Sequence, residues 1–133
     1  MSQFKIFKNK KIIITGHTGF KGSWLTFWLY ILGAKIIGIS KDIPSKPSLF
    51  QELRLKNKVI DIRLDIANLS KLKKIFKKYQ PDFVFHLAAQ SLVKKSYSFP
   101  VETFKSNTIG TLNVMESIKQ IKKKCYSVII TSV

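Results

Sequence analysis

Three glycines with regular spacing are the part of this chain where residue types alone indicate chemistry. Gly16, Gly19 and Gly22 lie in the segment IIITGHTGFKGSW, residues 12–24, where a β-branched run leads into an apolar helical run. Glycine adopts the dihedral angles of a tight turn at low cost, and its missing side chain lets backbone N–H groups approach an anion at the positive end of the following helix. The GxxGxxG pattern in this context therefore indicates a cradle for the pyrophosphate of a dinucleotide.

Five short apolar runs that suit β-strands alternate with helical patterns along the chain. The predicted helices cover residues 20–32, 49–53 and 69–79 and a long segment from Pro100, while residues 88–99 are a predicted loop. The predicted strands are residues 11–15, 35–39, 58–64, 83–87 and 126–131. Strands that alternate with crossover helices form a parallel sheet, so we predict a doubly wound α/β fold, the Rossmann fold, with a ligand at the carboxyl ends of the strands.

The long helix from Pro100 contains two poor helix formers, Asn107 and Gly110. We predict that Asn107 hydrogen-bonds exposed backbone near the fourth strand, and that Gly110 lets the helix approach the sheet. The apolar spacing of this helix places one set of residues on a common face: Val101, Phe104, Thr108, Leu112, Met115 and Ile118.

The composition is that of one globular domain over residues 1–133. Apolar residues make up 45% of the chain, which is enough for a buried core, and the single cysteine, Cys125, excludes an internal disulfide. We interpret Cys125 as a buried structural thiol and expect a cytoplasmic protein. The apolar run that follows the basic start ends after three isoleucines and is too short for a signal-peptide core, and the apolar run of residues 24–32 is too short for a membrane span, so we expect no membrane partner.

A net charge of +17 raises the question of a nucleic-acid partner. The chain has 22 lysines but only two arginines, although arginine is the residue preferred for base recognition and bidentate phosphate binding. Between residues 69 and 79 the lysines occupy one side of a helical repeat whose other side is apolar, which is typical of a solvated helix face. We therefore expect no specific nucleic-acid binding.

The carboxyl ends of the predicted strands gather the candidate cofactor contacts. They comprise the glycine loop, the end of the second strand, the residues after the third and fourth strands, and one residue of the long helix. The predicted cofactor-binding residues are Gly16, His17, Thr18, Gly19, Phe20, Gly22, Ser40, Asp65, Ile66, Leu87, Ala88, Ala89, Gln90 and Asn107.

The end of the second strand bears on the choice between NAD and NADP. A ribose-binding carboxylate is expected about 20 residues past the glycines, at the strand tip, but the residue there is Ser40. Asp42 lies close by, next to Lys41. Asp42 can therefore bind the ribose hydroxyls, Lys41 can bind a 2′-phosphate, or both are solvated loop charges. We favour NAD and leave NADP open.

Three further polar residues have more than one interpretation. Asp65 can hydrogen-bond an adenine amino group while Ile66 packs on the ring, or it can be a carboxylate at the approach to the next helix. His17 and His86 are the only histidines, and no other metal ligands cluster with them, so we assign no metal. We interpret His86 as a hydrogen-bonded core residue.

Several motifs together resemble those of CDP-glucose 4,6-dehydratases, members of the extended short-chain dehydrogenase/reductase superfamily. They are TGHTGFKGSWL, PSLF, HLAAQSLVKKSYSFPVETFKSNTIGTLNVMES and a following strand that ends in TS. The resemblance covers essentially the whole chain and places the family's adenine-contacting pair on Asp65 and Ile66. It implies a tightly held NAD, CDP-glucose as the nucleotide-sugar substrate and a homodimer built through helices. The implied reaction oxidises C4 of the sugar, eliminates water between C5 and C6, and returns the hydride to C6.

The resemblance also implies catalytic residues that this chain lacks. The family has a TSDK stretch after the fifth strand and a YxxxK pair further on, whereas here Thr131 and Ser132 are followed by Val133. Ser132 matches the family's hydroxyl that faces the sugar, and it is the one predicted catalytic residue. We therefore expect a domain truncated after its fifth strand, without the sugar-binding region, inactive alone and prone to self-association through exposed apolar surface. The alternatives are a non-catalytic NAD(P)-binding module or part of a related nucleotide-sugar epimerase or dehydratase.

Overall fold

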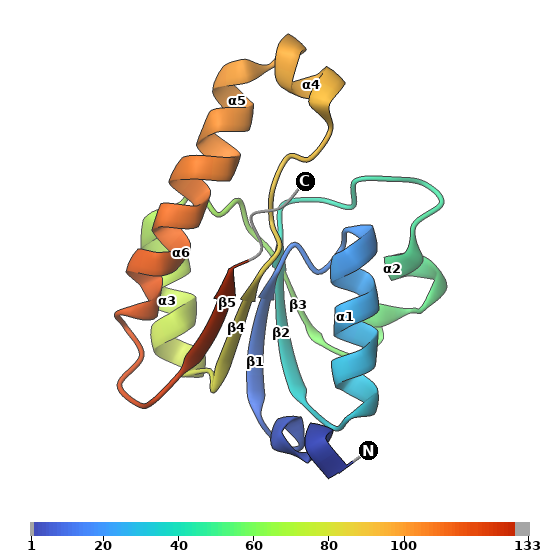
Figure 1. Ribbon diagram of the computed structural model, residues 1–133, viewed down its shortest axis with the longest axis vertical. Coiled ribbons are helices and arrows are strands. Elements are labelled where there is room, and N and C mark those ends of the chain that lie inside the picture. The colour runs from blue at the N-terminus through green and yellow to red at the C-terminus, as the bar shows by residue number, and fades with distance from the viewer. Residues whose placement is uncertain (1, 130–133) are drawn as a thin grey trace.

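The computed structural model describes residues 2–129, which form a parallel β-sheet with helices on both faces (Figure 1). The order of the strands across the sheet is β3-β2-β1-β4-β5, and every neighbouring pair is parallel. The strands are β1 (Lys11–Thr15), β2 (Lys35–Ser40), β3 (Ile60–Arg63), β4 (Phe83–His86) and β5 (Tyr126–Ile129). This order confirms the predicted doubly wound α/β fold, with the reversal of strand order at β1 and β4.

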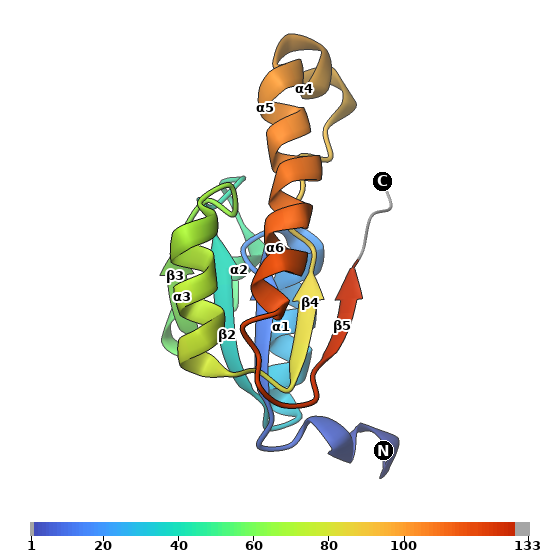
Figure 2. The same cartoon turned by 90° about the vertical axis from the view of Figure 1, so that its left-hand side faces the viewer.

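Helices from different parts of the chain cover the two faces of the sheet (Figures 1 and 2). One face carries α1 (Phe20–Ile31) and the short α2 (Leu49–Glu52), while the other carries α3 (Leu69–Tyr79) and α6 (Gly110–Ile118). Beyond the carboxyl ends of the strands lie α4 (Val93–Ser98) and α5 (Pro100–Phe104). The remaining helical segments are short: η1 (Ser2–Phe7), η2 (Leu55–Asn57) and the π-helical η3 (Lys105–Ile109).

The isoleucines of the central strands divide the core into two layers. Successive side chains of a strand point to opposite faces, so Ile13 packs with α3 and α6 whereas Ile12 and Ile14 pack with α1. All three are fully buried. A parallel strand covered on both faces reads as a continuous apolar run, which explains why the β-branched segment preceding the glycine loop was a reliable strand signal.

The helix α3 begins and ends where its sequence signals predict. The Asn68 side chain accepts a hydrogen bond from Lys71 N at 3.1 Å, and Gln80 adopts a left-handed conformation after the last turn. Leu72 and Phe76 are fully buried, and most lysines of the helix are exposed. The predicted solvated lysine face is therefore present.

The predicted loop of residues 88–99 is partly wrong, because it contains the helix α4. None of the α4 side chains is buried, so its sequence carries no burial periodicity that would reveal a helix. The predicted long helix from Pro100 is present but changes to π-helical geometry at η3, between α5 and α6.

Most of the apolar face predicted for that long helix is exposed to solvent, whereas Ile118 at its end packs against the core. Val101, Phe104, Leu112 and Met115 are between 51% and 65% exposed. The buried side of α6 consists instead of smaller residues, namely Gly110, Asn113, Val114 and Ser117. A repeat of large apolar residues thus predicted the helix correctly without predicting which side packs on the sheet.

Two single-residue expectations also need correction. Gly110 packs against Ile66 in the loop after β3 rather than against the sheet, since an added Cβ would lie 2.5 Å from Ile66 Cδ1. Cys125 is only partly buried, although it was interpreted as a buried thiol. Within residues 2–129, no helix combines the length and the hydropathy needed to cross a bilayer.

Candidate functional site

A cavity of about 390 Å³ lies at the carboxyl ends of β1 to β4, between the glycine loop and the α4–α5 segment. Parallel α/β sheets place their ligands at this edge. The cavity brings together most of the predicted cofactor residues: Gly16, Thr18, Gly19, Ser40, Asp65, Ile66, Leu87, Ala88, Ala89 and Gln90.

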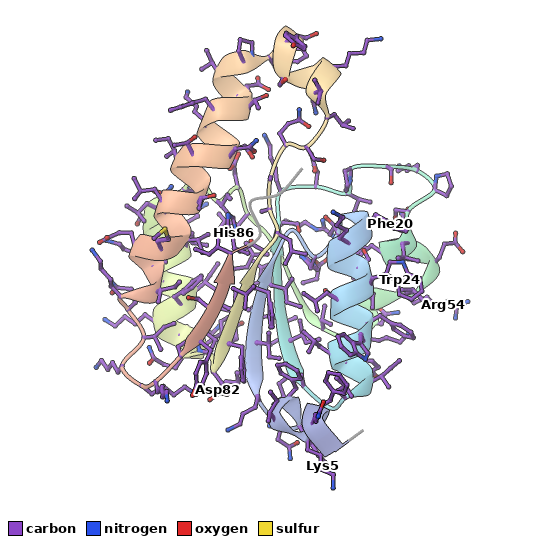
Figure 3. The ribbon with its side chains drawn as sticks, viewed as in Figure 1. Lys5, Phe20, Trp24, Arg54, Asp82 and His86 are labelled. Carbon is purple, nitrogen blue, oxygen red and sulfur yellow. The ribbon has the colours of Figure 1, made fainter. Side chains whose placement is uncertain are left out.

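Four predicted cofactor residues do not line this cavity. His17 is fully buried behind the glycine loop, and Gly22 packs beneath Gly16. Phe20 lies at the start of α1 with 71% of its surface exposed (Figure 3), and Asn107 holds the loop after β4 from outside the cavity. The predicted catalytic residue Ser132 lies outside the described residues.

The glycine loop is held by direct backbone-to-backbone packing. Gly16 has a φ of +78°, and an added Cβ there would lie 2.7 Å from Ala88 N. An added Cβ at Gly22 would overlap the Gly16 carbonyl oxygen. A Cβ at Gly19 would meet only the Gly16 oxygen, at an ordinary 3.4 Å. Gly16 and Gly22 are therefore required by the fold, whereas the open side of Gly19 belongs to the cavity.

The first turn of α1 has no side chain that satisfies its backbone donors. Gly19 is the N-cap residue, so no side-chain oxygen caps the helix there, and the first turn contains no acidic residue. The unpaired N–H groups and the positive end of the helix dipole remain available to an anion. This arrangement fits the pyrophosphate cradle that the glycine spacing predicted.

The end of β2 and the loop after it are tied to the glycine loop by two hydrogen bonds. Thr18 N donates to Ser40 Oγ at 3.4 Å, and Thr18 Oγ1 donates to the Asp42 carbonyl oxygen at 2.6 Å. Lys41 Nζ lies 3.5 Å from Asp65 Oδ2, where both side chains are largely solvated. Lys41 is therefore paired with the carboxylate of another residue that lines the cavity.

Asp65 has a local structural role in addition to its place in the cavity wall. Its Oδ1 accepts a hydrogen bond from Ala67 N at 2.9 Å, which is the role of a carboxylate at the approach to α3. From α6, Asn113 Nδ2 donates to the carbonyl oxygens of Ile66 and Ala67, at 2.9 and 3.1 Å. Asn113 was missed from sequence, where the only available signal was a polar residue inside an apolar helix.

His86 is the centre of a hydrogen-bond chain that joins β1, β4 and α6. Thr111 Oγ1 donates to the Asn107 carbonyl oxygen, so it accepts from His86 Nε2 at 2.8 Å. His86 Nδ1 then accepts from Thr15 Oγ1 at 2.6 Å. Burial lowers the pKa of His86 to about 4, so the ring is neutral at neutral pH. His86 is confirmed as a hydrogen-bonded core residue.

Asn107 fixes the loop after β4 by a reciprocal pair of hydrogen bonds. Its Oδ1 accepts from Gln90 N at 2.7 Å, and its Nδ2 donates to the Gln90 carbonyl oxygen at 3.0 Å. Asn107 belongs to the π-helical η3, a geometry that often occurs at functional sites. The prediction that Asn107 satisfies backbone near the fourth strand is therefore confirmed.

Sequence reasoning missed the part of the cavity wall that comes from α4, α5 and η3. Residues 88–99 were predicted as a loop, and no local pattern placed the predicted helix from Pro100 near the glycines. The missed lining residues are Lys95, Phe99, Glu102, Thr103, Lys105 and Ser106. Among the described residues, no three histidine, cysteine, aspartate or glutamate side chains are grouped as metal ligands.

Comparison with known proteins agrees with this geometry. Residues 13–133 match a family model described as GDP-mannose 4,6 dehydratase. CDP-glucose 4,6-dehydratase of Salmonella typhimurium is 43% identical over 114 residues, which cover 86% of this chain and 32% of that protein.

Solved structures of the same fold extend the comparison. An epimerase of Methanothermobacter thermautotrophicus has a TM-score of 0.82 at 28% identity, over 97% of this chain and 37% of that one. UDP-glucose 4-epimerase of Thermus thermophilus, solved in complex with NAD, has a TM-score of 0.72 at 30% identity, over 84% of this chain and 34% of that one. The chain thus spans about a third of the length of the curated relatives it matches.

The packing of the glycine loop predicts that two alanine substitutions differ in their effect on the free energy of unfolding. Gly22→Ala should lower the free energy of unfolding by about 2 kcal/mol or more, because the new Cβ overlaps the Gly16 carbonyl. Gly19→Ala should stay within about 1 kcal/mol of the wild type, because its Cβ fits. Urea unfolding followed by circular dichroism measures both values. Equal losses in the two variants would contradict the packing described here.

The buried His86 predicts acid sensitivity of the fold. The unfolded chain binds a proton at His86 below its ordinary pKa of 6.5, whereas the folded chain resists protonation down to about 4. The free energy of unfolding should therefore fall by about 3 kcal/mol as the pH drops through this window. Burial also lowers the pKa of His17, which adds a loss in the same direction.

Denaturant unfolding across this pH range, in the wild type and in His86→Gln, tests the assignment. The variant cannot take up the proton, so its stability should decline less steeply with acid, even if it is less stable at neutral pH. Identical slopes in the two proteins would show that His86 is not the group responsible.

Proposed function

Because the chain belongs to the GDP-mannose 4,6 dehydratase family, we propose that it forms the NAD-binding part of a nucleotide-sugar 4,6-dehydratase that acts on CDP-glucose. The observation that carries the proposal is the cavity over the uncapped start of α1, where the glycine loop, Ser40 and the Asp65–Ile66 pair meet. The 43% identity to a CDP-glucose 4,6-dehydratase supports the choice of sugar nucleotide.

The cavity lining fits a dinucleotide in both size and chemistry. Its volume lies in the range of ligand pockets of about 300–1,000 Å³. The N–H groups at the start of α1 would hold the pyrophosphate, and Ser40 and Asp65 would hold the adenosine half, with Ile66 against the base. Residues 87–90 would face the nicotinamide half. When bound, NAD supplies the hydride acceptor for oxidation of the sugar and the hydride donor that completes the reaction.

The remaining chemistry needs an acid, a base and a tyrosine–lysine pair, and this sequence does not supply that set. No tyrosine in the chain is followed four residues later by a lysine, and Val133 follows Ser132 where the family has aspartate. The residues present would bind and orient a cofactor. We therefore propose that the 133-residue chain alone binds NAD without converting CDP-glucose.

Binding of NADH to the purified chain tests the first half of this proposal. The wild type should show saturable binding by calorimetry. Gly19→Ala should bind about tenfold more weakly, because its Cβ enters the space proposed for the pyrophosphate while the fold is kept. Lys74→Ala, on the solvated face of α3, is the control and should bind like the wild type. Absence of binding in the wild type would overturn the proposal.

Incubation with CDP-glucose and NAD tests the second half. Chromatography should detect no 4-keto-6-deoxy product from the 133-residue chain. The positive control is a CDP-glucose 4,6-dehydratase of full family length under the same conditions. Product from the short chain would mean that its own residues complete the catalytic set.

For the assembled enzyme we propose a homodimer that buries the exposed face of α5 and α6. Val101 and Phe104 of α5 and Leu112 and Met115 of α6 are each more than half exposed, and exposed large apolar residues of this kind mark surfaces that other protein segments cover.

Sedimentation measurements test the dimer. Leu112→Glu should shift the dimer–monomer equilibrium toward monomer by at least about tenfold, since it places a charge in the proposed interface. Lys74→Glu also introduces a carboxylate on an exposed helix face, but on α3, and should leave the equilibrium unchanged. An equal effect of both substitutions would argue against this face.

A further inference from the structure

A chain of buried polar contacts runs from the cavity through the glycine loop to β3. Ser40 Oγ lies 2.9 Å from His17 Nδ1, and His17 Nε2 lies 2.8 Å from Asp61 Oδ1. Arg63 donates to the other carboxylate oxygen, Asp61 Oδ2, at 2.9 Å. The His17 side chain has no exposed surface and that of Asp61 is 8% exposed. Of these residues, only Ser40 also lines the 390 Å³ cavity.

The chemistry of the partners sets the direction of each hydrogen bond. The Asp61 carboxylate, paired with Arg63, is an acceptor, so His17 Nε2 carries the hydrogen. Burial lowers the pKa of His17 even though Asp61 opposes this, so the ring is neutral and Nδ1 holds a lone pair. Nδ1 therefore accepts the single hydrogen of the Ser40 hydroxyl.

The hydroxyl oxygen of Ser40 is then left with acceptor capacity alone. A hydroxyl has one donor and two acceptor positions. The donor is used by His17, and one lone pair accepts the long hydrogen bond of 3.4 Å from Thr18 N. The second lone pair is not used by these two contacts, and Ser40 is one of the residues that line the cavity, at the tip of β2.

Packing holds the His17 ring in this orientation. An added Cβ at Gly38 of β2 would overlap the ring, so the glycine provides the space in which the imidazole lies. The Phe50 ring meets it edge to face, with centroids 5.3 Å apart. The His17 carbonyl oxygen accepts a hydrogen bond from Ser23 Oγ at 3.1 Å. The charged groups that face the ring are Asp61 and Arg63.

We propose that the His17–Asp61 pair fixes the Ser40 hydroxyl as a hydrogen-bond acceptor, so that Ser40 receives a ribose hydroxyl of NAD and selects against NADP. The inference rests on the proposed function for its ligand. In dinucleotide-binding folds an acidic residue accepts from the ribose hydroxyls near this position. Here a neutral serine would take the same role, because its only hydrogen is donated to His17 Nδ1 and its oxygen can then only accept.

The selectivity follows from the donors that the two cofactors offer. The ribose of NAD presents a 2′-hydroxyl that can donate to Ser40 Oγ. The 2′-phosphate of NADP is mostly dianionic at neutral pH and has only acceptor oxygens, so it meets an acceptor with no hydrogen between them. His17 and Asp61 are positioning residues in this scheme, because they act on the ligand only through Ser40.

The direction of the hydrogen bonds between Ser40, His17 and Asp61 can be measured without any cofactor. Nitrogen-15 NMR of the ring nitrogens should show His17 at neutral pH with a hydrogen on Nε2 and none on Nδ1. His17→Gln identifies the signals, since His86 is the only other histidine. A protonated ring, or a hydrogen on Nδ1, would overturn the inference whatever the chain binds.

The ratio of NAD to NADP affinity tests the role of Ser40. Ser40→Ala should reduce NAD affinity about tenfold and change NADP affinity little, so the ratio falls about tenfold. Ser40→Thr keeps the hydroxyl and should keep most of the ratio. Asp61→Asn should lower the ratio as well, because an amide no longer forces the hydrogen onto Nε2.

Ser23→Ala is the matched control for a purely structural effect. It removes another buried hydroxyl that contacts His17 but does not line the cavity, so it should change both affinities equally. An unchanged ratio in Ser40→Ala, with normal NAD binding in the wild type, overturns this inference alone. A wild type that binds neither cofactor overturns both the proposed function and the ribose contact. The NMR result still decides whether the Ser40 hydroxyl donates to His17 Nδ1.

Discussion

The close backbone approach at Gly16 is the constraint on which the site depends. Gly16 N donates to the Ile39 carbonyl oxygen at 2.8 Å, which ties the turn after β1 to the end of β2. The missing Cβ admits the backbone of Ala88 from the end of β4, and Gly22 of α1 fits beneath the Gly16 carbonyl. Three elements thus meet around one residue without side chains between them. Any side chain there would push apart the walls of the cavity that lies directly above.

The two histidines make matching sets of hydrogen bonds on opposite sides of β1. Each is a neutral ring that takes a hydroxyl hydrogen from a strand end, Thr15 or Ser40, and donates to a partner on another element. Each of these hydroxyls in turn accepts from a backbone N–H of a cavity loop, that of Ala88 or Thr18. Because burial disfavours charge on both rings, these chains position loops and are poorly suited to transfer protons.

The parts of the structure that were predictable from sequence are those with local signals. Isoleucine runs, the cap Asn68 and the glycine spacing each act over a few residues, and they predicted the strands, α3 and the tight turn before α1. The partners of His17 carry no such signal, because Asp61 lies 44 positions away and reaches the ring only through the β2–β3 register, which pairs Gly38 with Asp61. The α4–α5 wall was missed because its side chains are not buried in a periodic pattern.

In α1 and α6 most large apolar residues are exposed, although large apolar residues usually point toward the core. The buried side of α1 contains Gly22, Ser23 and Thr26 with Leu29, while Phe20, Trp24, Trp28 and Ile31 are exposed, and α6 repeats this arrangement. Small residues let these helices lie close to their neighbours, as Gly22 does against the glycine loop and Gly110 against Ile66. The distance of each helix from the site is therefore set by its small residues. The large ones remain exposed, so hydrophobic periodicity here identifies the helices without identifying the side that packs on the sheet.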